Sequence, residues 1–277
     1  MIRYLSDAPL GRCCTFLTGG RAKRLAFAYN ADELAEAADS GALVLGRGSN
    51  VLIGDCGYAG DAVINRTNER VFEGGVCVCD SGVLISSLAR EYMERGLSGL
   101  EWAYGLPGTV GGATVGNAGA FGGCTADSVI SAEVLAGGKI RTLSADECVF
   151  AYRSSGICGT VIRVTLKAES GNKDLIRAES ENNLKTRRDK QPLGASAGSV
   201  FKAADGVPAG KLIEEAGLKG LTFGGAEISE KHANFIINRG GADSGDVLAL
   251  VNVARAAVYD KFGVKLEREI KLYGDFF

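Results

Sequence analysis

Histidine is nearly absent from the sequence, since His232 is the only one among 277 residues. A histidine-based zinc site, a Ser-His-Asp triad and a histidine-tethered cofactor would all compete for this one side chain. None of the eight cysteines stands in a Cys-x-x-Cys pair, so we expect no metal site. Reduced, mainly structural thiols in a cytoplasmic protein are the expectation, and a redox pair is the alternative, with Cys77 and Cys79 two residues apart.

The chain also lacks an excess of positive charge and lacks long apolar runs. Its 31 lysines and arginines face 33 aspartates and glutamates, which gives a net charge of −2. General nucleic-acid binding needs a basic surface, so it is disfavoured, whereas a local cationic pocket for a small anion is not. No run approaches the roughly 18 apolar residues of a membrane span. The first residues contain no apolar stretch of a signal peptide, and we therefore expect a cytoplasmic location.

The overall composition is that of a folded protein with unusually many glycines. Hydrophobic residues make up 46% and charged residues 23%, as in ordinary globular chains. At roughly 100–200 residues per domain, the length predicts two domains. A polar, helix-compatible stretch at 170–190 is the expected connection between them.

Hydrophobic periodicity predicts both helices and strands, which indicates an α+β protein. We expect one helix that begins after Asn30 as its N-cap, one at 83–97, one that starts at Pro208 and one at 244–262. Ser144–Glu147 has the form of a capping box. Expected strands lie at 42–45, 51–53, 62–65, 76–80, 160–168, 232–238 and 264–272.

Glycine is concentrated where the chain could approach a ligand closely. Eight of the 19 residues from Gly105 to Gly123 are glycine, and Gly46–Asn50 has a similar character. Successive backbone N–H groups in such turns form anion-binding nests suited to a pyrophosphate. Neither stretch matches a P-loop or the dinucleotide fingerprint. Glycine-rich turns of an irregular β fold are the alternative interpretation.

Charged and hydroxyl side chains supply weaker signals. The basic run Arg187, Arg188 and Lys190 could bind an anion or could be a solvated face, and Arg153 is a single instance. Ser199, between small and apolar residues, could be an exposed hydroxyl but is not a G-x-S-x-G nucleophile.

Two further residues have equally plain structural interpretations. Glu269 lies on the polar face of a predicted strand, where its pattern does not distinguish it from Glu267. His232 begins another predicted strand, where a histidine is commonly a hydrogen-bonded structural residue.

Taken together and in order, these strings resemble the UDP-N-acetylenolpyruvoylglucosamine reductase family, the MurB flavoenzymes of bacterial cell-wall synthesis. Each string is weak alone, but the ordered set covers nearly the whole chain and is highly specific. The matching segments are 45–53, 105–113 with 117–120, 152–153, 187–193, 196–202, 209–220, 231–238 and 262–270.

The resemblance implies a fold and a reaction. It implies an FAD-binding region of the vanillyl-alcohol-oxidase (PCMH) type at 1–169, with lobes at about 1–65 and 66–169, and a smaller α+β substrate domain at 191–277. FAD would be bound non-covalently, and NADPH would deliver hydride to it. The flavin would then reduce the enolpyruvyl ether of UDP-N-acetylglucosamine enolpyruvate to UDP-N-acetylmuramate, which makes the enzyme a UDP-N-acetylmuramate dehydrogenase. The expected setting is peptidoglycan synthesis, cell shape and cell division, with a monomer as the expected state.

The resemblance also implies roles for individual residues. Ser199 would donate the proton, while Arg153 and Glu269 would polarise the enolpyruvyl carboxylate; a nearby cation, Lys190 or Lys202, would assist the serine. Substrate-binding residues would be Tyr152, Arg187, Lys190, Lys202 and His232. Cofactor-binding residues would be Gly46, Arg47, Gly48, Ser49, Asn50, Gly105, Pro107, Gly108, Thr109, Gly111, Gly112, Asn117, Ala118, Gly119 and Ala120.

The sequence departs from the family pattern in three places. Ala203-Ala204-Asp205 replaces the usual Asn-Pro after Ser-Val-Phe-Lys, and Phe121 replaces a common tyrosine. The short interval from Arg153 to Arg187 identifies a shorter variant without the insertion that carries a tyrosine lid. The alternatives are a flavin oxidoreductase that acts on a different small acid and a non-catalytic binder of flavin or nucleotide sugar.

Overall fold

The computed structural model describes residues 2–276 and divides the chain into two compact units. Unit 1 comprises Met1–Leu5, Leu25–Arg47 and Asp61–Arg187, and unit 2 comprises Ser6–Arg24, Gly48–Gly60 and Arg188–Phe277. Two stretches from the first 60 residues thus belong to the same unit as the C-terminal part. The functional division predicted from the sequence, at 169 and 191, stays a prediction.

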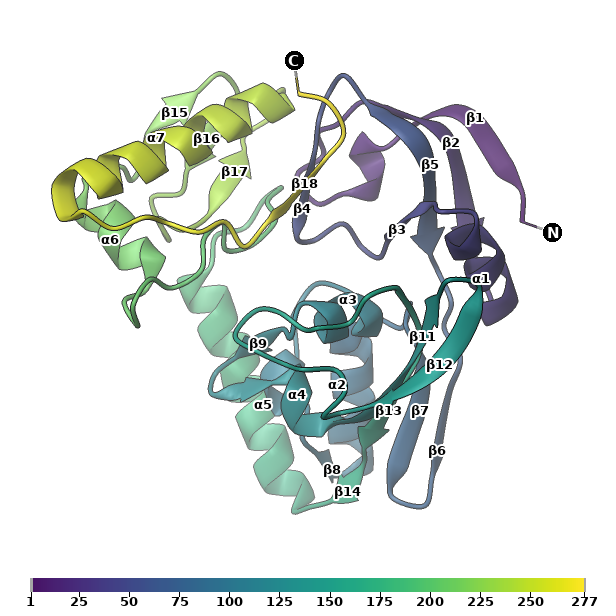
Figure 1. Ribbon diagram of the computed structural model, residues 1–277. Helices are drawn as coiled ribbons and strands as arrows, with labels where there is room; N and C mark the ends of the chain where they lie inside the picture. The colour runs from purple at the N-terminus through teal and green to yellow at the C-terminus, as the bar shows by residue number, and fades with distance from the viewer. Residues whose placement is uncertain (1, 277) are drawn as a thin grey trace. The chain divides into compact units, whose positions relative to one another are not determined.

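Unit 1 is built on a five-stranded antiparallel sheet (Figure 1). The strand order is β12 (Lys139–Ser144), β11 (Val129–Ala136), β13 (Thr160–Lys167), β7 (Val76–Asp80) and β6 (Arg70–Glu73). The main apolar cluster of this unit joins β7 and β13 to α2 (Ile85–Arg95) and α3 (Val110–Val115). The remaining elements of this region are β8 (Leu97–Ser98), η2 (Glu101–Ala103), β9 (Gly119–Ala120), β10 (Gly123–Cys124), α4 (Thr125–Ser128), β14 (Glu169–Ser170) and α5 (Lys173–Lys190).

A second apolar cluster lies under α1 (Ala31–Asp39). Asn30 caps this helix as predicted, because its side chain accepts a hydrogen bond from Glu33 N at 2.9 Å. The cluster includes Ile162, whereas Val164 belongs to the main cluster. Both side chains are buried and Arg163 between them is exposed, so the half-buried character expected for the strand at 160–168 is present. A register shift between β11 and β13 follows Glu133.

A four-stranded sheet has the order β1 (Tyr4–Pro9), β2 (Arg21–Ala28), β5 (Tyr58–Asn65) and β3 (Leu43–Leu45). The short helix η1 (Gly11–Cys13) lies between β1 and β2 in the chain. β3 runs parallel to β5. The strands predicted at 42–45 and 62–65 are thus confirmed.

Unit 2 contains the antiparallel sheet β15 (Thr222–Phe223), β16 (Ala226–Ile228) and β17 (Ile236–Asn238), with α6 (Ala209–Glu215) and α7 (Ser244–Phe262). A parallel pair joins β4 (Val51–Ile53) to β18 (Lys271–Tyr273). The helix predicted at 244–262 is confirmed to the residue. Its ends explain this, because Asp243 and Asp246 form a capping box and Gly263 ends the helix with φ +69°.

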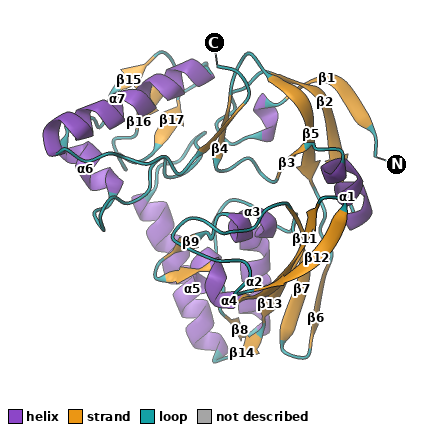
Figure 2. Ribbon diagram, in the orientation of Figure 1, coloured by secondary structure: helices purple, strands orange, loops and turns teal. Residues whose placement is uncertain are grey.

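Three predicted elements are shorter than expected or differ in type. Only 236–238 of the strand predicted at 232–238 forms. Of the strand predicted at 264–272 only 271–272 forms, as part of β18, so most of 263–270 is drawn as a loop in Figure 2. The capping-box bonds of Ser144 and Glu147 form, but they close a turn instead of starting a helix.

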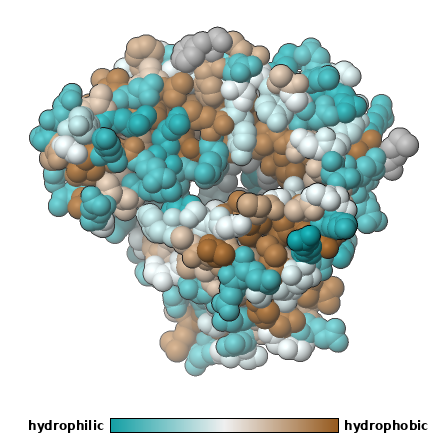
Figure 3. All heavy atoms as spheres, in the orientation of Figure 1, coloured by the Kyte–Doolittle hydropathy of each residue, from teal (hydrophilic) through white to brown (hydrophobic). Residues whose placement is uncertain are grey.

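The surface is mixed in polarity. On the face that Figure 3 shows, hydrophobic and hydrophilic residues are interspersed. Among the described residues, no helix combines the length and the apolar character needed to cross a membrane. Within residues 2–276 the eight cysteines form no disulfide, and four of them, including Cys77 and Cys79, are buried. Hydrogen bonding with Cys77 and burial raise the pKa of the Cys79 thiol, which makes it less reactive.

Candidate functional site

The first glycine-rich loop of unit 1, residues 105–113, is anchored along one side by backbone hydrogen bonds. Gly111 N donates to Ser81 O and Val110 N to Val83 O, both at 2.8 Å, and Ile85 N donates to Gly108 O at 3.2 Å. A Cβ at Gly111 would lie 2.6 Å from Ser81 Cβ, so only glycine fits there. The loop that follows β7 therefore fixes the course of residues 108–111.

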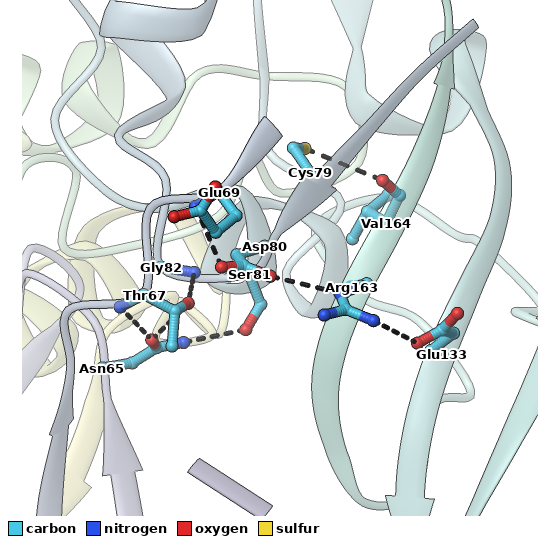
Figure 4. A network of polar contacts seen from close by, with 10 residues as sticks. All are labelled: Asn65, Thr67, Glu69, Cys79, Asp80, Ser81, Gly82, Glu133, Arg163 and Val164. Carbon is cyan, nitrogen blue, oxygen red and sulfur yellow. Dashed lines mark hydrogen bonds and ion pairs between the residues drawn. The ribbon is translucent and has the colours of Figure 1, made fainter. Parts of the chain in front are cut away.

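A buried polar network holds that supporting loop (Figure 4). Asn65 Nδ2 donates to Ser81 Oγ at 2.8 Å, while its Oδ1 accepts from Thr67 Oγ1 at 2.9 Å. Gly82 N in turn donates to Thr67 Oγ1 at 3.1 Å. Sequence reasoning missed Asn65 and Thr67, because an Asn that ends a strand gives no sign of its partner 16 residues away.

Gly46, from the shorter glycine-rich segment, meets the loop that contains Thr109 and Gly112 within unit 1. A Cβ at Gly46 would lie 2.5 Å from Thr109 Oγ1. Thr109 is 4% exposed and caps α3, since its Oγ1 accepts from Gly112 N at 3.3 Å. The structure thus brings Gly46, Thr109 and Gly112, three predicted cofactor residues, into one place.

The other side of this loop is open. Gly112 is exposed, and the nearest atom to a Cβ there would be Thr109 Oγ1 at an ordinary 3.5 Å. Pro107 is exposed as well. A surface of bare backbone, held rigidly from behind, suits the close approach of a large cofactor such as FAD. The residues present therefore fit the cofactor that the sequence implies.

Alanine at the two adjacent glycines should separate packing from cofactor binding. We expect Gly111→Ala to lower the free energy of unfolding by about 1–3 kcal/mol through overlap with Ser81. Gly112→Ala should leave that energy unchanged or raise it by up to about 1 kcal/mol, because alanine favours the helix. Its methyl group should nevertheless weaken FAD binding. Denaturant unfolding of the apoprotein and FAD titration measure the two effects, and wild-type FAD affinity in Gly112→Ala would contradict the assignment of the open side.

The second glycine-rich run, residues 116–123, lies against the loop that carries Arg153. Asn117 Nδ2 donates to Ala151 O at 2.9 Å, and Arg153 Nη2 donates to Gly119 O at 2.7 Å. Arg153 has φ +56°, an uncommon conformation for a residue with a side chain, and its guanidinium lies 5.2 Å from the Tyr152 ring centroid. The hydrogen bonds of Asn117 and Arg153 thus connect the second glycine-rich run to the loop that carries Arg153. A cofactor contact of Asn117 stays a prediction.

The basic run at the end of α5 divides into buried and exposed members. Arg187 is 8% exposed, and its Nη2 donates to Trp102 O at 3.4 Å, while Arg188 and Lys190 are exposed. The Arg187 guanidinium lies 5.2 Å from the ring of Phe121 in the second glycine-rich run. Burial lowers the pKa of Arg187, which nonetheless stays charged at neutral pH. A solvated face does not describe Arg187.

In unit 2, Ser199 and Glu269 lie on adjacent extended segments. Ser199 forms an isolated antiparallel bridge with Phe235, and Glu269 N donates to the carbonyl of Val200, the next residue, at 2.8 Å. Ser199 and Glu269, two predicted catalytic residues 70 positions apart in sequence, therefore lie on neighbouring segments. Asn50, a predicted cofactor residue, donates from Nδ2 to Glu269 O at 3.3 Å.

The structure distinguishes the two carboxylates that the sequence pattern could not. Glu267 is exposed, and its Oε1 lies 2.6 Å from Lys202 Nζ. This lysine lowers the pKa of the Glu267 carboxyl group. Glu269 is half-buried. Glu267 thus lies in an ion pair at the surface, whereas Glu269 is less exposed and adjoins the Ser199 segment, and its role stays a prediction.

His232 is half-buried in unit 2 and is placed by its neighbours. Its Nδ1 accepts a hydrogen bond from Asn234 N at 3.2 Å, and its ring centroid lies 4.9 Å from that of Phe235. Burial is the main cause that lowers the pKa of His232. An Nδ1 that accepts must carry no proton, so the neutral ring carries its proton on Nε2 and offers it as a donor.

This tautomer can be measured directly, because the chain has a single histidine. In a long-range ¹H–¹⁵N spectrum of untagged protein we expect the pattern of the Nε2–H form and a pKa below 6.5. His232 should then stay neutral across pH 7–8. The Nδ1–H form, or a pKa above 6.5, would contradict the assignment.

Comparisons with known proteins agree over the full chain. Residues 30–144 match the model of an FAD binding domain, and 190–273 match the C-terminal domain of UDP-N-acetylenolpyruvoylglucosamine reductase. The enzyme of that name from Moorella thermoacetica is 42% identical over 99% of this chain and 94% of its own length, and that from Caldicellulosiruptor bescii is 42% identical over 99% and 92%. The crystal structure of the enzyme from Thermus caldophilus superposes with a TM-score of 0.86, at 34% identity over 99% of both chains.

Proposed function

The chain belongs to the UDP-N-acetylenolpyruvoylglucosamine reductase family, and from this premise we propose that it reduces UDP-N-acetylglucosamine enolpyruvate to UDP-N-acetylmuramate with NADPH. It is a flavoprotein of peptidoglycan synthesis with an FAD-binding domain at residues 30–144. When bound, FAD supplies the hydride transfer from NADPH to the enolpyruvyl carbon, and the protein must position and polarise the substrate.

The chain's own residues would bind the cofactor along the two glycine-rich segments. Pro107 and Gly112 lie on the open side of the loop 105–113 in unit 1, and Gly46 packs against the buried Thr109. Nearby N–H groups at 110 and 111 are already used to hold this loop in place. These hydrogen bonds make the loop rigid, and a rigid loop would hold the cofactor at a fixed position.

The substrate chemistry needs one acid and groups that stabilise negative charge. Hydride addition leaves an enolate-like charge on the substrate, which donors and cations stabilise. We assign the proton donor to Ser199, and the polarisation of the carboxylate to Arg153 and Glu269. The observation that supports the pairing of Ser199 with Glu269 is the hydrogen bond from Glu269 N to the carbonyl of Val200, next to Ser199. The role of Arg153 is the one that the family resemblance implies.

Serine is a weak acid, so it needs a strongly basic acceptor and a cation nearby. An enolate is such an acceptor. Lys202 is already paired with Glu267 at 2.6 Å, which leaves Lys190 as the less committed of the two proposed cations.

Recognition of the nucleotide sugar would use the remaining predicted residues. Arg187 supplies a buried positive charge, and Lys190 and Lys202 supply further ones. Tyr152, 58% exposed, supplies a ring and a hydroxyl group. His232 contributes a neutral Nε2–H donor instead of a charge. The short interval between Arg153 and Arg187 supports a variant without a tyrosine lid, and we propose a cytoplasmic monomer.

A steady-state assay tests the proposal. Consumption of NADPH should depend on added UDP-N-acetylglucosamine enolpyruvate, and mass spectrometry should find a product two hydrogens heavier than the substrate. NADPH consumption with other small unsaturated acids, but none with this substrate, would instead indicate a different reductase of the same cofactor fold.

A further inference from the structure

The segment that carries Ser199 is held between two others in unit 2. On one side Ser199 pairs with Phe235, and on the other Phe201 pairs with Arg268. Lys202 N donates to Glu267 O at 2.9 Å along the same edge. Val200 and Phe201 are 1% and 2% exposed. Their backbone groups are therefore cut off from water and need partners within the protein.

Asn234 supplies these partners through both its backbone and its side chain. Its carbonyl accepts from Val200 N at 2.8 Å. Its side-chain Oδ1 accepts from Phe201 N at 2.9 Å, and its Nδ2 donates to Phe201 O at 2.8 Å. Asn234 is 6% exposed, and both side-chain bonds are buried. One side chain thus acts as a strand partner for the second residue after Ser199.

Only a short primary amide serves both groups of Phe201. Aspartate keeps the acceptor for Phe201 N but has no donor for Phe201 O, and alanine has neither. Glutamine has both groups on a longer stem that does not fit the same reach. The position therefore calls for asparagine on chemical grounds.

We propose that Asn234 is a positioning residue for the proton donor Ser199. The two side-chain hydrogen bonds between Asn234 and Phe201, which we call the clamp, and the backbone hydrogen bond with Val200 hold the two residues that follow Ser199. The same residues lie beside the Glu267–Glu269 segment. On the preceding side the chain is held by the hydrogen bond from Asn238 N to Ala195 O at 2.9 Å, and Gly198, next to Ser199, has φ +72°. The clamp therefore acts on the direction of the Ser199 hydroxyl group from the following side.

The same residue connects the clamp to the predicted substrate residue His232. Asn234 N donates to His232 Nδ1 at 3.2 Å. One asparagine thus holds the backbone beside the predicted acid and the tautomer of a predicted substrate donor. Both roles act through other residues, and Asn234 itself need not touch the substrate.

The test compares Asn234→Asp with a matched control, Asn238→Ala, in the full-length holoenzyme. Asn238 also uses its side chain for three backbone partners, Phe16 O, Gly240 N and Ala242 N, but none lies in the Ser199 segment. Anaerobic stopped-flow absorbance would measure flavin reduction by NADPH and flavin reoxidation by the enolpyruvyl substrate separately. Melting temperature and flavin spectrum report on folding, and Asn234→Ser is the second variant should the aspartate fail to fold.

We expect reoxidation to slow about 100-fold in Asn234→Asp, since a displacement of about 1 Å costs that much, with flavin reduction little changed. The solvent deuterium isotope effect on reoxidation should rise, because proton donation becomes more limiting. Asn238→Ala should show neither change. Equal loss in both steps, equal loss in the control, or unchanged reoxidation would overturn the inference.

The inference rests on the proposed function, and the experiment separates the two failures. Wild-type protein that is never reoxidised by this substrate would refute the proposed function and the inference with it. Wild-type protein that is reoxidised, beside an Asn234→Asp variant that behaves alike, would refute the inference alone.

Discussion

Ser199→Ala should slow flavin reoxidation by the enolpyruvyl substrate about 100- to 10,000-fold, the usual contribution of a general acid. Flavin reduction by NADPH should keep its wild-type rate, because no proton from Ser199 is needed in that step. Rapid-mixing absorbance under anaerobic conditions measures both. The stability of the variant should change little, since Ser199 is half-buried and its backbone pairing with Phe235 does not involve the hydroxyl group.

Ser199→Cys provides the control for this prediction. A thiol is a stronger acid than a hydroxyl group, with a pKa of about 8.5, so the cysteine variant should recover part of the reoxidation rate. Equal rates in the alanine and cysteine variants would show that the side chain at 199 does not donate the proton. Equal loss in both half-reactions would show a general defect instead.

Glu269→Gln should slow reoxidation by roughly 100- to 1,000-fold, the loss seen when one group that stabilises transition-state charge is removed. The matched variant is Glu267→Gln, two residues away. Glu267 is exposed and pairs with Lys202 at 2.6 Å, and surface ion pairs contribute about 0–1 kcal/mol. We therefore expect near wild-type reoxidation in Glu267→Gln. Single-turnover kinetics of the two variants measure the difference.

The reverse order of effects would contradict the assignment. A large loss in Glu267→Gln with little loss in Glu269→Gln would mean that the exposed carboxylate is the functional one. Lys202 would then have to act through its ion pair with Glu267, and the cation near Ser199 would be Lys202.

The sequence predicted best those elements whose ends carry local chemical signals. The helix at 244–262 is bounded by a capping box and a glycine in the left-handed region, and both can be read from neighbouring residues. The helix after Asn30 is similar. These signals act over three or four residues, so tertiary structure has little chance to override them.

The sequence predicted worst the extended segments around Ser199. Alternation at 264–272 is genuine, since Leu266 and Ile270 are buried, yet a strand also needs a partner with consecutive pairing. Here the partner is Val200–Lys202, whose other side is occupied by the side chain of Asn234. Only isolated bridges form between these described segments. Side-chain pairing of this kind leaves no periodic trace in a sequence.

The candidate site shows the same division. The glycine-rich segments lie where two loops meet, because Gly46 and Thr109 are in contact, and their cofactor role stays a prediction. The support beneath them, from Asn65 and Thr67, depends on contacts between distant residues and was not predictable. Burial of Arg187 and the ion pair of Glu267 were equally hidden, although each decides which charge is available.

The central claim about this protein is that one flavin accepts hydride from NADPH and passes it to the enolpyruvyl ether. An anaerobic absorbance trace of the purified holoprotein tests this most directly. Addition of NADPH should bleach the flavin band, and addition of UDP-N-acetylglucosamine enolpyruvate should restore it. Bleaching without recovery on the second addition would contradict the proposed substrate. A protein that binds no FAD and shows no flavin band would contradict the flavoenzyme assignment as a whole.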